Sequence, residues 1–231
     1  MAADSSALDG AVIAFDLDGT LVDTAPDLIG ALNHVLTEEG LPTVPLVSAR
    51  HLVGGGVRVL IERGFAEAGR PLDAERTPTL VERFIDIYLG RIAKESRPFD
   101  GLDAALDDLA AAGARLAVCT NKRTDLSLAL LDGLGLTRRF AAVIGADQAV
   151  QKPDPRLLFL TIERAGGVLE RTLYVGDSPI DLATARAAGT PIVGVSFGYS
   201  EQPLNPADFD GFIDHYSELP ALARRLLSHV G

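Results

Sequence analysis

The chain has 231 residues, of which 47% are hydrophobic, and its formal net charge is −11. This apolar content argues against disorder and is enough for a substantial core. The acidic balance disfavours nucleic acid or an anionic membrane as partner, because both bind basic faces, and no apolar run approaches the ~18 residues that cross a bilayer.

The remaining composition places few further limits on function. Cys119 is the only cysteine, so we predict a reducing cytoplasm and interpret Cys119 as a small apolar residue at a strand end. Residues 1–9 lack the basic and apolar regions of a signal peptide. The histidines show no metal-ligand pairing and are interpreted as surface or packing residues: His34, His51, His215 and His229.

A short apolar run near the N-terminus ends abruptly in polar chemistry. Residues 11–15 are all apolar, and Asp16, Asp18, Gly19 and Thr20 follow within five positions. Such a run suits a central parallel strand that is covered on both faces. Ligands of such sheets bind beyond the carboxyl ends of the strands, so we expect Asp16 and Asp18 at a site.

The next 75 or so residues carry a helical pattern and no convincing strand. Helices are predicted from Thr24, with a capping box to Asp27, over 57–68, and over 78–89 with Thr77 as N-cap. A simple βαβ unit needs only about 30 residues. We therefore predict an all-helical cap domain at 24–97, built as a mobile lid, inserted into an α/β core formed by 1–23 and 98–231.

Strands and helices alternate in the rest of the chain. Helices are predicted over 102–112, 124–131 and 219–228. Strands are predicted at 115–119, 142–145, 172–175 and 192–195, with a weak one at 212–213. Alternation of this kind indicates an α/β fold with a Rossmann-like parallel sheet and helices on both faces.

Further polar residues follow the later strands. Thr120 and Asn121 come after the second strand, Lys152 after the third, and Asp177 and Asp181 after the fourth. The carboxyl ends of parallel strands lie at one edge of the sheet, so these side chains are expected to converge with Asp16 and Asp18.

The expected set combines a hard-cation site with a phosphate site. Asp16, Asp18 and Asp177 offer oxygen ligands without His or Cys, which suits Mg²⁺ rather than zinc. Thr120, Asn121 and Lys152 offer donors for phosphate oxygens. Asp16 can then attack phosphorus, with Asp18 as general acid and base.

Asp181 has two interpretations that the sequence leaves open. It follows Ser178 and Pro179 in a helix-start pattern, in which it would cap the helix. It can equally support the metal ligands from behind.

These motifs resemble the four motifs of the haloacid dehalogenase superfamily in order and spacing: 16–20, 120–121, 152–153 and 176–181. The resemblance implies Asp16 as nucleophile, Asp18 as acid and base, and Mg²⁺ held by Asp16, the backbone carbonyl of Asp18, and Asp177. It also implies a small helical cap. The second acid argues against a dehalogenase proper, which lacks it and needs no metal.

Within the superfamily the chain most resembles the phosphoglycolate phosphatases, through residues 15–24, 53–56, 120–122 and 176–199. The glycines at 54–56 are either a hinge or a place where backbone N–H groups of Gly55 and Gly56 face an anionic substrate tail. Arg58 either pairs with a substrate carboxylate or is a surface arginine.

The resulting hypothesis is an Mg²⁺-dependent phosphatase that acts on a small phosphorylated metabolite, 2-phosphoglycolate first, as a monomer or homodimer. Sugar phosphates, nucleoside monophosphates and pyrophosphate are alternative substrates. A phosphosugar mutase and a noncatalytic binding protein on the same fold are the other two hypotheses.

Overall fold

The structure is a computed structural model that describes residues 8–200 and 203–228. Residues 1–9, which are not predicted to be a signal peptide, lie mostly outside the described residues. His229 also lies outside them. Within them, no helix is long and apolar enough to cross a membrane.

Six parallel strands form one sheet in the order β5-β4-β1-β6-β7-β8. A separate antiparallel pair, β2 and β3, joins the two chain crossings between this sheet and the inserted helices. The strands are β1 (Val12–Phe15), β2 (Val22–Asp23), β3 (Arg97–Pro98), β4 (Arg115–Thr120), β5 (Ala142–Gly145), β6 (Thr172–Gly176), β7 (Ile192–Val195) and β8 (Gly211–Ile213).

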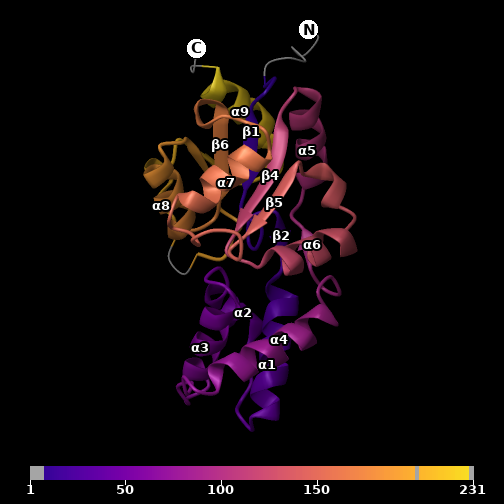
Figure 1. Cartoon of the computed structure of the whole chain (residues 1–231), viewed down its shortest axis with the longest axis vertical. Helices are drawn as coiled ribbons and strands as arrows, with labels where there is room; N and C mark the ends of the chain where they lie inside the picture. The colour runs from indigo at the N-terminus through magenta and orange to yellow at the C-terminus, as the bar shows by residue number, and fades with distance from the viewer. Residues whose placement is uncertain (1–7, 201–202, 229–231) are drawn as a thin grey trace.

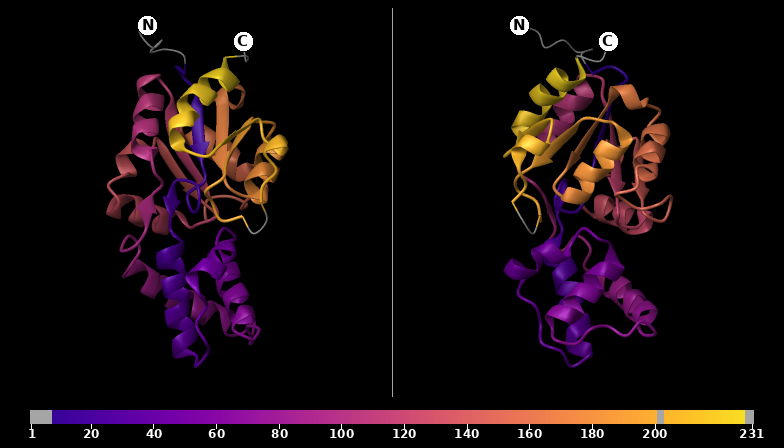
Figure 2. Two further views of the ribbon diagram at one scale, coloured as in Figure 1. Left: turned by 180° about the vertical axis from the view of Figure 1, so that it is seen from behind. Right: turned by 90° about the vertical axis from the view of Figure 1, so that its left-hand side faces the viewer.

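Helices cover both faces of the sheet, and a separate group of helices lies beyond the carboxyl ends of its strands (Figures 1 and 2). The helices at the sheet are α5 (Leu102–Ala111), α6 (Thr124–Gly133), α7 (Arg156–Arg164), α8 (Pro179–Ala188) and α9 (Leu219–Leu227). Those of the separate group, called the cap helices below, are α1 (Ala25–Glu38), α2 (Leu46–Ala49), α3 (Val57–Glu67) and α4 (Thr77–Leu89).

Strand β1 lies at the centre of the sheet because each of its residues is apolar and fully buried. Alternate side chains along a strand point to opposite faces. Ile13 and Phe15 accordingly pack with residues of α5 and α9, whereas Val12 and Ala14 pack with residues of α7 and α8. Two apolar layers thus enclose the strand that leads to Asp16.

The cap helices bury a second hydrophobic cluster, which also includes Leu126 and Tyr199 from the core. Leu32, Ile61 and Phe84, from α1, α3 and α4, are each at most 1% exposed and belong to one cluster. Helices α1 and α4 pack along each other, and α3 contacts both. This packing is why the inserted helices hold together, and the domain division at 24 and 97 stays a prediction.

The predicted capping box at the start of α1 is wrong. Thr24 is the N-cap but makes no side-chain capping bond; its hydroxyl donates to Asp18 instead, at 2.6 Å. Asp27 accepts hydrogen bonds from Ser96 and from the backbone of Glu95. Both side chains are used in tertiary contacts, which local spacing does not reveal.

The predicted α/β class is confirmed, and the predicted strands differ from the observed ones by one residue at most. Residues 156–164 received no prediction and form helix α7, and the short helix α2 received none either. The sequence of α7 contains Leu157, Leu158, Phe159 and Leu160 in a row, so its apolar run does not distinguish a helix from a strand.

Candidate active site

The site lies where β1, β4 and β6 end side by side. The register pairs Phe15 with Val118 on one side and Val175 on the other. The next residue, Asp16, donates its backbone N–H to the carbonyl of Val175 at 2.9 Å. The sheet itself therefore brings Asp16, Thr120 and Asp177 to one edge, as predicted.

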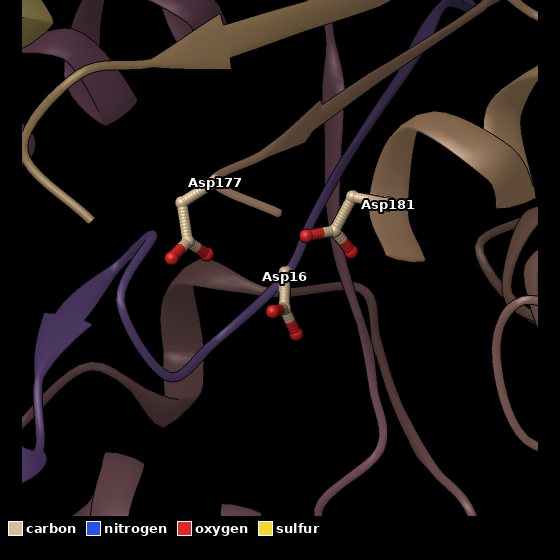
Figure 3. A group of neighbouring side chains, drawn as sticks. All are labelled: Asp16, Asp177 and Asp181. Carbon is tan, nitrogen blue, oxygen red and sulfur yellow. The ribbon is translucent and has the colours of Figure 1, made fainter. Parts of the chain in front are cut away.

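Three carboxylates meet at this edge (Figure 3). One oxygen from each of Asp16, Asp177 and Asp181 lies within 4.8 Å of the others. These residues are only 6%, 3% and 0% exposed. Buried acids at this separation repel one another unless a cation lies among them.

Asp177 is held tightly by the surrounding backbone and one hydroxyl. Thr20 Oγ1 donates to its Oδ1 at 2.8 Å, and the backbone N–H of Tyr199 donates to its Oδ2 at 2.8 Å. Gly19 has φ +87°, and a Cβ on it would lie 2.5 Å from Asp177 Oδ2; a Cβ on Gly198 would lie 2.2 Å from Asp177 Cβ. Only glycine allows this close approach.

Lys152 joins two of the acids. Its Nζ lies 2.9 Å from Asp16 Oδ1 and 2.6 Å from Asp181 Oδ1, and it donates to the hydroxyl of Tyr174 at 3.0 Å. The Asn121 side chain holds the backbone of Lys152 in both directions, at 2.8 Å and 3.2 Å. Asn121 thus positions Lys152, and its predicted contact with phosphate stays a prediction, as does that of Thr120.

The two interpretations of Asp181 are compatible in the structure. Its Oδ2 and backbone N–H form a capping box with Ser178 at the start of α8. Its Oδ1 accepts from Lys152 and from the hydroxyl of Tyr174. One carboxylate therefore caps the helix and holds the lysine that faces Asp16.

Asp18 lies in a separate environment. Its Oδ1 accepts from Thr24 Oγ1 at 2.6 Å and from Lys122 Nζ at 2.8 Å. The Lys122 ammonium also lies 4.7 Å from the ring centre of Tyr88 in the cap helix α4. Lys122 was not predicted as a site residue; its position directly after Thr120 and Asn121 was the available signal.

Burial and mutual repulsion change the ionisation of the acids. Burial, partly offset by Lys152, raises the pKa of Asp16 to about 6. Burial, followed by the charges of Asp181 and Asp16, raises the pKa of Asp177 to about 8. Burial alone would lower the pKa of Lys152, but Asp16 and Asp181 outweigh it and raise that pKa, so the lysine stays charged.

These residues fit a divalent cation. Three buried carboxylates face one another with a single ammonium between two of them, which leaves negative charge uncompensated. The donors are all oxygens, which suits Mg²⁺. Asp16 and Asp177 line the cavity beside the sheet, whereas Asp181 does not line it and is bound to Lys152, Tyr174 and Ser178.

A cavity of about 290 Å³, called the site cavity below, separates the sheet edge from the cap helices. Asp16, Asp18 and Asp177 line it on the sheet side. His51, Gly54, Gly55 and Arg63 are among the residues that line it on the cap side.

The predicted cap contacts divide into two groups. Gly54 and Gly55 line the site cavity, and Gly56 lines a smaller recess beside Asp18. Arg58 lines neither; it pairs with Glu62 at 2.8 Å and its side chain is 70% exposed. The structure therefore supports the surface interpretation of Arg58. Arg63 received no prediction, and His51, which the sequence suggested as a surface or packing residue, lines the site cavity instead; no local motif distinguishes either residue.

Comparison with known proteins identifies the family. The family model described as haloacid dehalogenase-like hydrolase matches residues 13–195. The chain belongs to this family. It is 54% identical to a phosphoglycolate phosphatase of Caulobacter vibrioides, over 96% of this chain and 94% of the relative. It is 46% identical to one of Mesorhizobium japonicum, over 95% of this chain and 98% of the relative.

A solved structure shows the same architecture. A predicted phosphoglycolate phosphatase of Haemophilus somnus superimposes with a TM-score of 0.84 at 28% identity, over 93% of this chain and 98% of the other. The predicted resemblance to the haloacid dehalogenase superfamily is thus confirmed, as is the prediction of a phosphoric monoester hydrolase.

Proposed function

We propose that this phosphatase hydrolyses 2-phosphoglycolate to glycolate and phosphate, with Mg²⁺, through an aspartyl-phosphate on Asp16. The observation that supports this reaction is that Asp16 and Asp18 line the same cavity but lie in different environments. Asp16 lies with Lys152, Asp177 and Asp181, whereas Asp18 lies with Thr24 and Lys122. Two environments allow two roles.

In the first step a carboxylate oxygen of Asp16 attacks phosphorus, and the bond from phosphorus to the glycolate oxygen breaks. Asp18 gives a proton to the departing oxygen. In the second step Asp18 accepts a proton from water as that water attacks phosphorus, which releases phosphate and restores Asp16. Thr24 and Lys122 keep the carboxylate of Asp18 in place for both transfers.

Lys152 has two functions in this scheme. Its ammonium stabilises charge on the phosphoryl oxygens, with the donors of Thr120 and Asn121 beside it. It also keeps Asp16 ionised by offsetting the effect of burial on the pKa of that acid. Asp181 and Tyr174 hold the lysine at the distances given above.

The residues that would hold Mg²⁺ are Asp16, Asp177 and the backbone carbonyl of Asp18. When bound, the ion supplies positive charge to the phosphoryl oxygens and lowers the repulsion between Asp16 and the phosphate. Asp177 is suited to this role because Thr20 and Tyr199 orient its carboxylate without an opposing cation.

The substrate is proposed from the relatives and from the size of the cavity. Proteins 54% and 46% identical to this chain are phosphoglycolate phosphatases. The site cavity, about 290 Å³, lies near the lower limit of ligand pockets, roughly 300 Å³. A two-carbon phosphate fits that size. The cap at 24–97 as a mobile lid, the cytoplasmic location and the monomer or homodimer are part of this proposal.

Phosphate release tests the substrate. The panel comprises 2-phosphoglycolate, glucose phosphates, nucleoside monophosphates and pyrophosphate, each with Mg²⁺ and with EDTA. We expect the highest kcat/KM for 2-phosphoglycolate and loss of activity in EDTA. A higher kcat/KM for another substrate would reject the substrate but not the mechanism.

Trapping of the intermediate tests the mechanism. Acid quenching during turnover, then borohydride reduction and peptide mass analysis, should convert Asp16 to homoserine. Asp103→Asn is the matched control, because Asp103 is exposed on α5, away from the site cavity. Modification at another acid, or none at Asp16, would contradict the mechanism.

A further inference from the structure

Arg63 stands apart from the other arginines of the cap. Seven arginines lie between residues 25 and 96, and six of them form an ion pair with a carboxylate: Arg50, Arg58, Arg70, Arg76, Arg83 and Arg91. Among the residues that the structure describes, Arg63 has no such partner. Its one hydrogen bond is to the backbone carbonyl of His51, at 3.4 Å.

Arg63 is also the one arginine that lines the site cavity within the described chain. It follows Leu60 and Ile61 on α3, whose buried side chains fix that helix against the cap cluster. The guanidinium therefore lies on the cap wall, and the acids lie on the opposite, sheet wall.

The charges of the site cavity are arranged in two parts. On the sheet side, Asp16, Asp18 and Asp177 line the cavity, whereas Lys152 and Lys122 are buried outside its lining and are paired with Asp16, Asp181 and Asp18. On the cap side, His51 lies 3.6 Å from Glu67. Within the described chain, Arg63 is thus the permanent cation that lines the site cavity and has no carboxylate partner.

The backbone beside Arg63 leaves room for a small group. Gly54 and Gly55 line the same wall without side chains, and, apart from its chain neighbours, no atom of the described chain lies within 4 Å of the place that a Cβ on Gly54 would take. The cap wall thus presents a guanidinium next to bare backbone, which suits a compact anion.

We propose that Arg63 determines substrate specificity by binding the second anionic group of the substrate, a carboxylate, while the phosphate lies at Asp16. The planar guanidinium matches a carboxylate with two parallel hydrogen bonds. This inference rests on the proposed function, because it assumes a substrate with a phosphate at one end and a carboxylate at the other.

Two substrates distinguish carboxylate binding by Arg63 from a general effect of Arg63 on activity. They are 2-phosphoglycolate and 2-hydroxyethyl phosphate, which have the same phosphate ester and differ by a carboxylate against a hydroxymethyl group. In Arg63→Gln, kcat/KM for 2-phosphoglycolate should fall about 10- to 100-fold, as expected for a lost charge-assisted hydrogen bond. For 2-hydroxyethyl phosphate it should change less than about 3-fold.

Two further variants and one inhibitor show whether Arg63→Gln acts through carboxylate binding or only through a change in the structure of the cap. Arg63→Lys should recover part of the preference, because an ammonium binds a carboxylate as a point charge. Arg58→Gln, on the same helix but away from the site cavity, should leave kcat/KM for both substrates unchanged. The inhibition constant of inorganic phosphate should be the same in wild type and Arg63→Gln.

The outcomes distinguish the inference from the proposed function. If the wild type does not prefer 2-phosphoglycolate, the proposed substrate and the role of Arg63 both fail. If the wild type prefers it and Arg63→Gln retains that preference, or loses activity equally on both substrates, only the role of Arg63 is overturned.

Discussion

The two walls of the site cavity are built in different ways. On the sheet wall, Asp16 and Asp177 are under 7% exposed, and each is held by at least two contacts under 3 Å. On the cap wall, Arg63 is exposed and makes one hydrogen bond of 3.4 Å. Groups that make and break bonds need exact placement, whereas a group that recognises the far end of the substrate can adapt to it.

Asp16→Asn should have the largest effect, because it removes the proposed nucleophile from the rigid wall. We expect kcat to fall at least about 10³-fold. The same preparation should keep the thermal unfolding transition of a folded protein. Activity that survives this substitution would show that the sheet wall does not supply the nucleophile.

Lys122→Met should have the next largest effect on activity. It leaves the buried Asp18 with Thr24 as its remaining side-chain partner, so proton transfer loses its alignment. We expect kcat to fall about 10- to 100-fold with a smaller change in KM. Lys94→Met is the control, since Lys94 is exposed; an equal effect in both variants would contradict the role of Lys122.

Asp27→Ala tests stability rather than chemistry. Asp27 is fully buried and accepts from the backbone of Glu95 and Ser96, and it pairs with Arg91 at 3.3 Å. Burial raises its pKa, but these donors outweigh burial and lower it.

Removing the Asp27 carboxylate leaves buried donors unpaired, so the free energy of unfolding should fall by about 3 kcal/mol in urea denaturation. The Mg²⁺-dependent kcat of the folded variant should change little. A large loss of kcat without a loss of stability would show that Asp27 belongs to the site.

The pH dependence of stability in EDTA tests the charge of the sheet wall. The pKa of Asp177 is raised from 3.8 to about 8, so the folded protein holds a proton that the unfolded chain releases. Stability from this group is highest below pH 4 and is lost as pH rises towards 8. The free energy of unfolding should fall less over this range in Asp177→Asn than in wild type.

Mg²⁺ should reduce the same fall in wild type, because it binds the ionised carboxylates of the folded protein. Urea denaturation at pH 5 and pH 8, with EDTA or with Mg²⁺, measures both effects. If the free energy of unfolding falls equally between pH 5 and pH 8 in wild type and Asp177→Asn, the pKa of Asp177 is not raised as the structure indicates.

The core of the site was predictable because its residues follow strands. Asp16, Thr120 and Asp177 were identified from apolar runs that end in polar residues, and parallel strands bring such ends together. Thr24 and Asp27 were misassigned as a capping box for the opposite reason. Their partners, Asp18 and the backbone of residues 95 and 96, depend on packing that helical spacing does not encode.

The sequence by itself determined the α/β class, the stretch of helices between the first two long strands and the acids that follow the strands, because the periodicity of each element and the residues at its end can be read locally. Only the tertiary structure decided which cations face which acids. Lys122 lies 104 positions from Asp18, and Lys152 lies 29 from Asp181. Arg63 resembles any exposed arginine until α3 packs against the cap cluster and places it on the cavity wall.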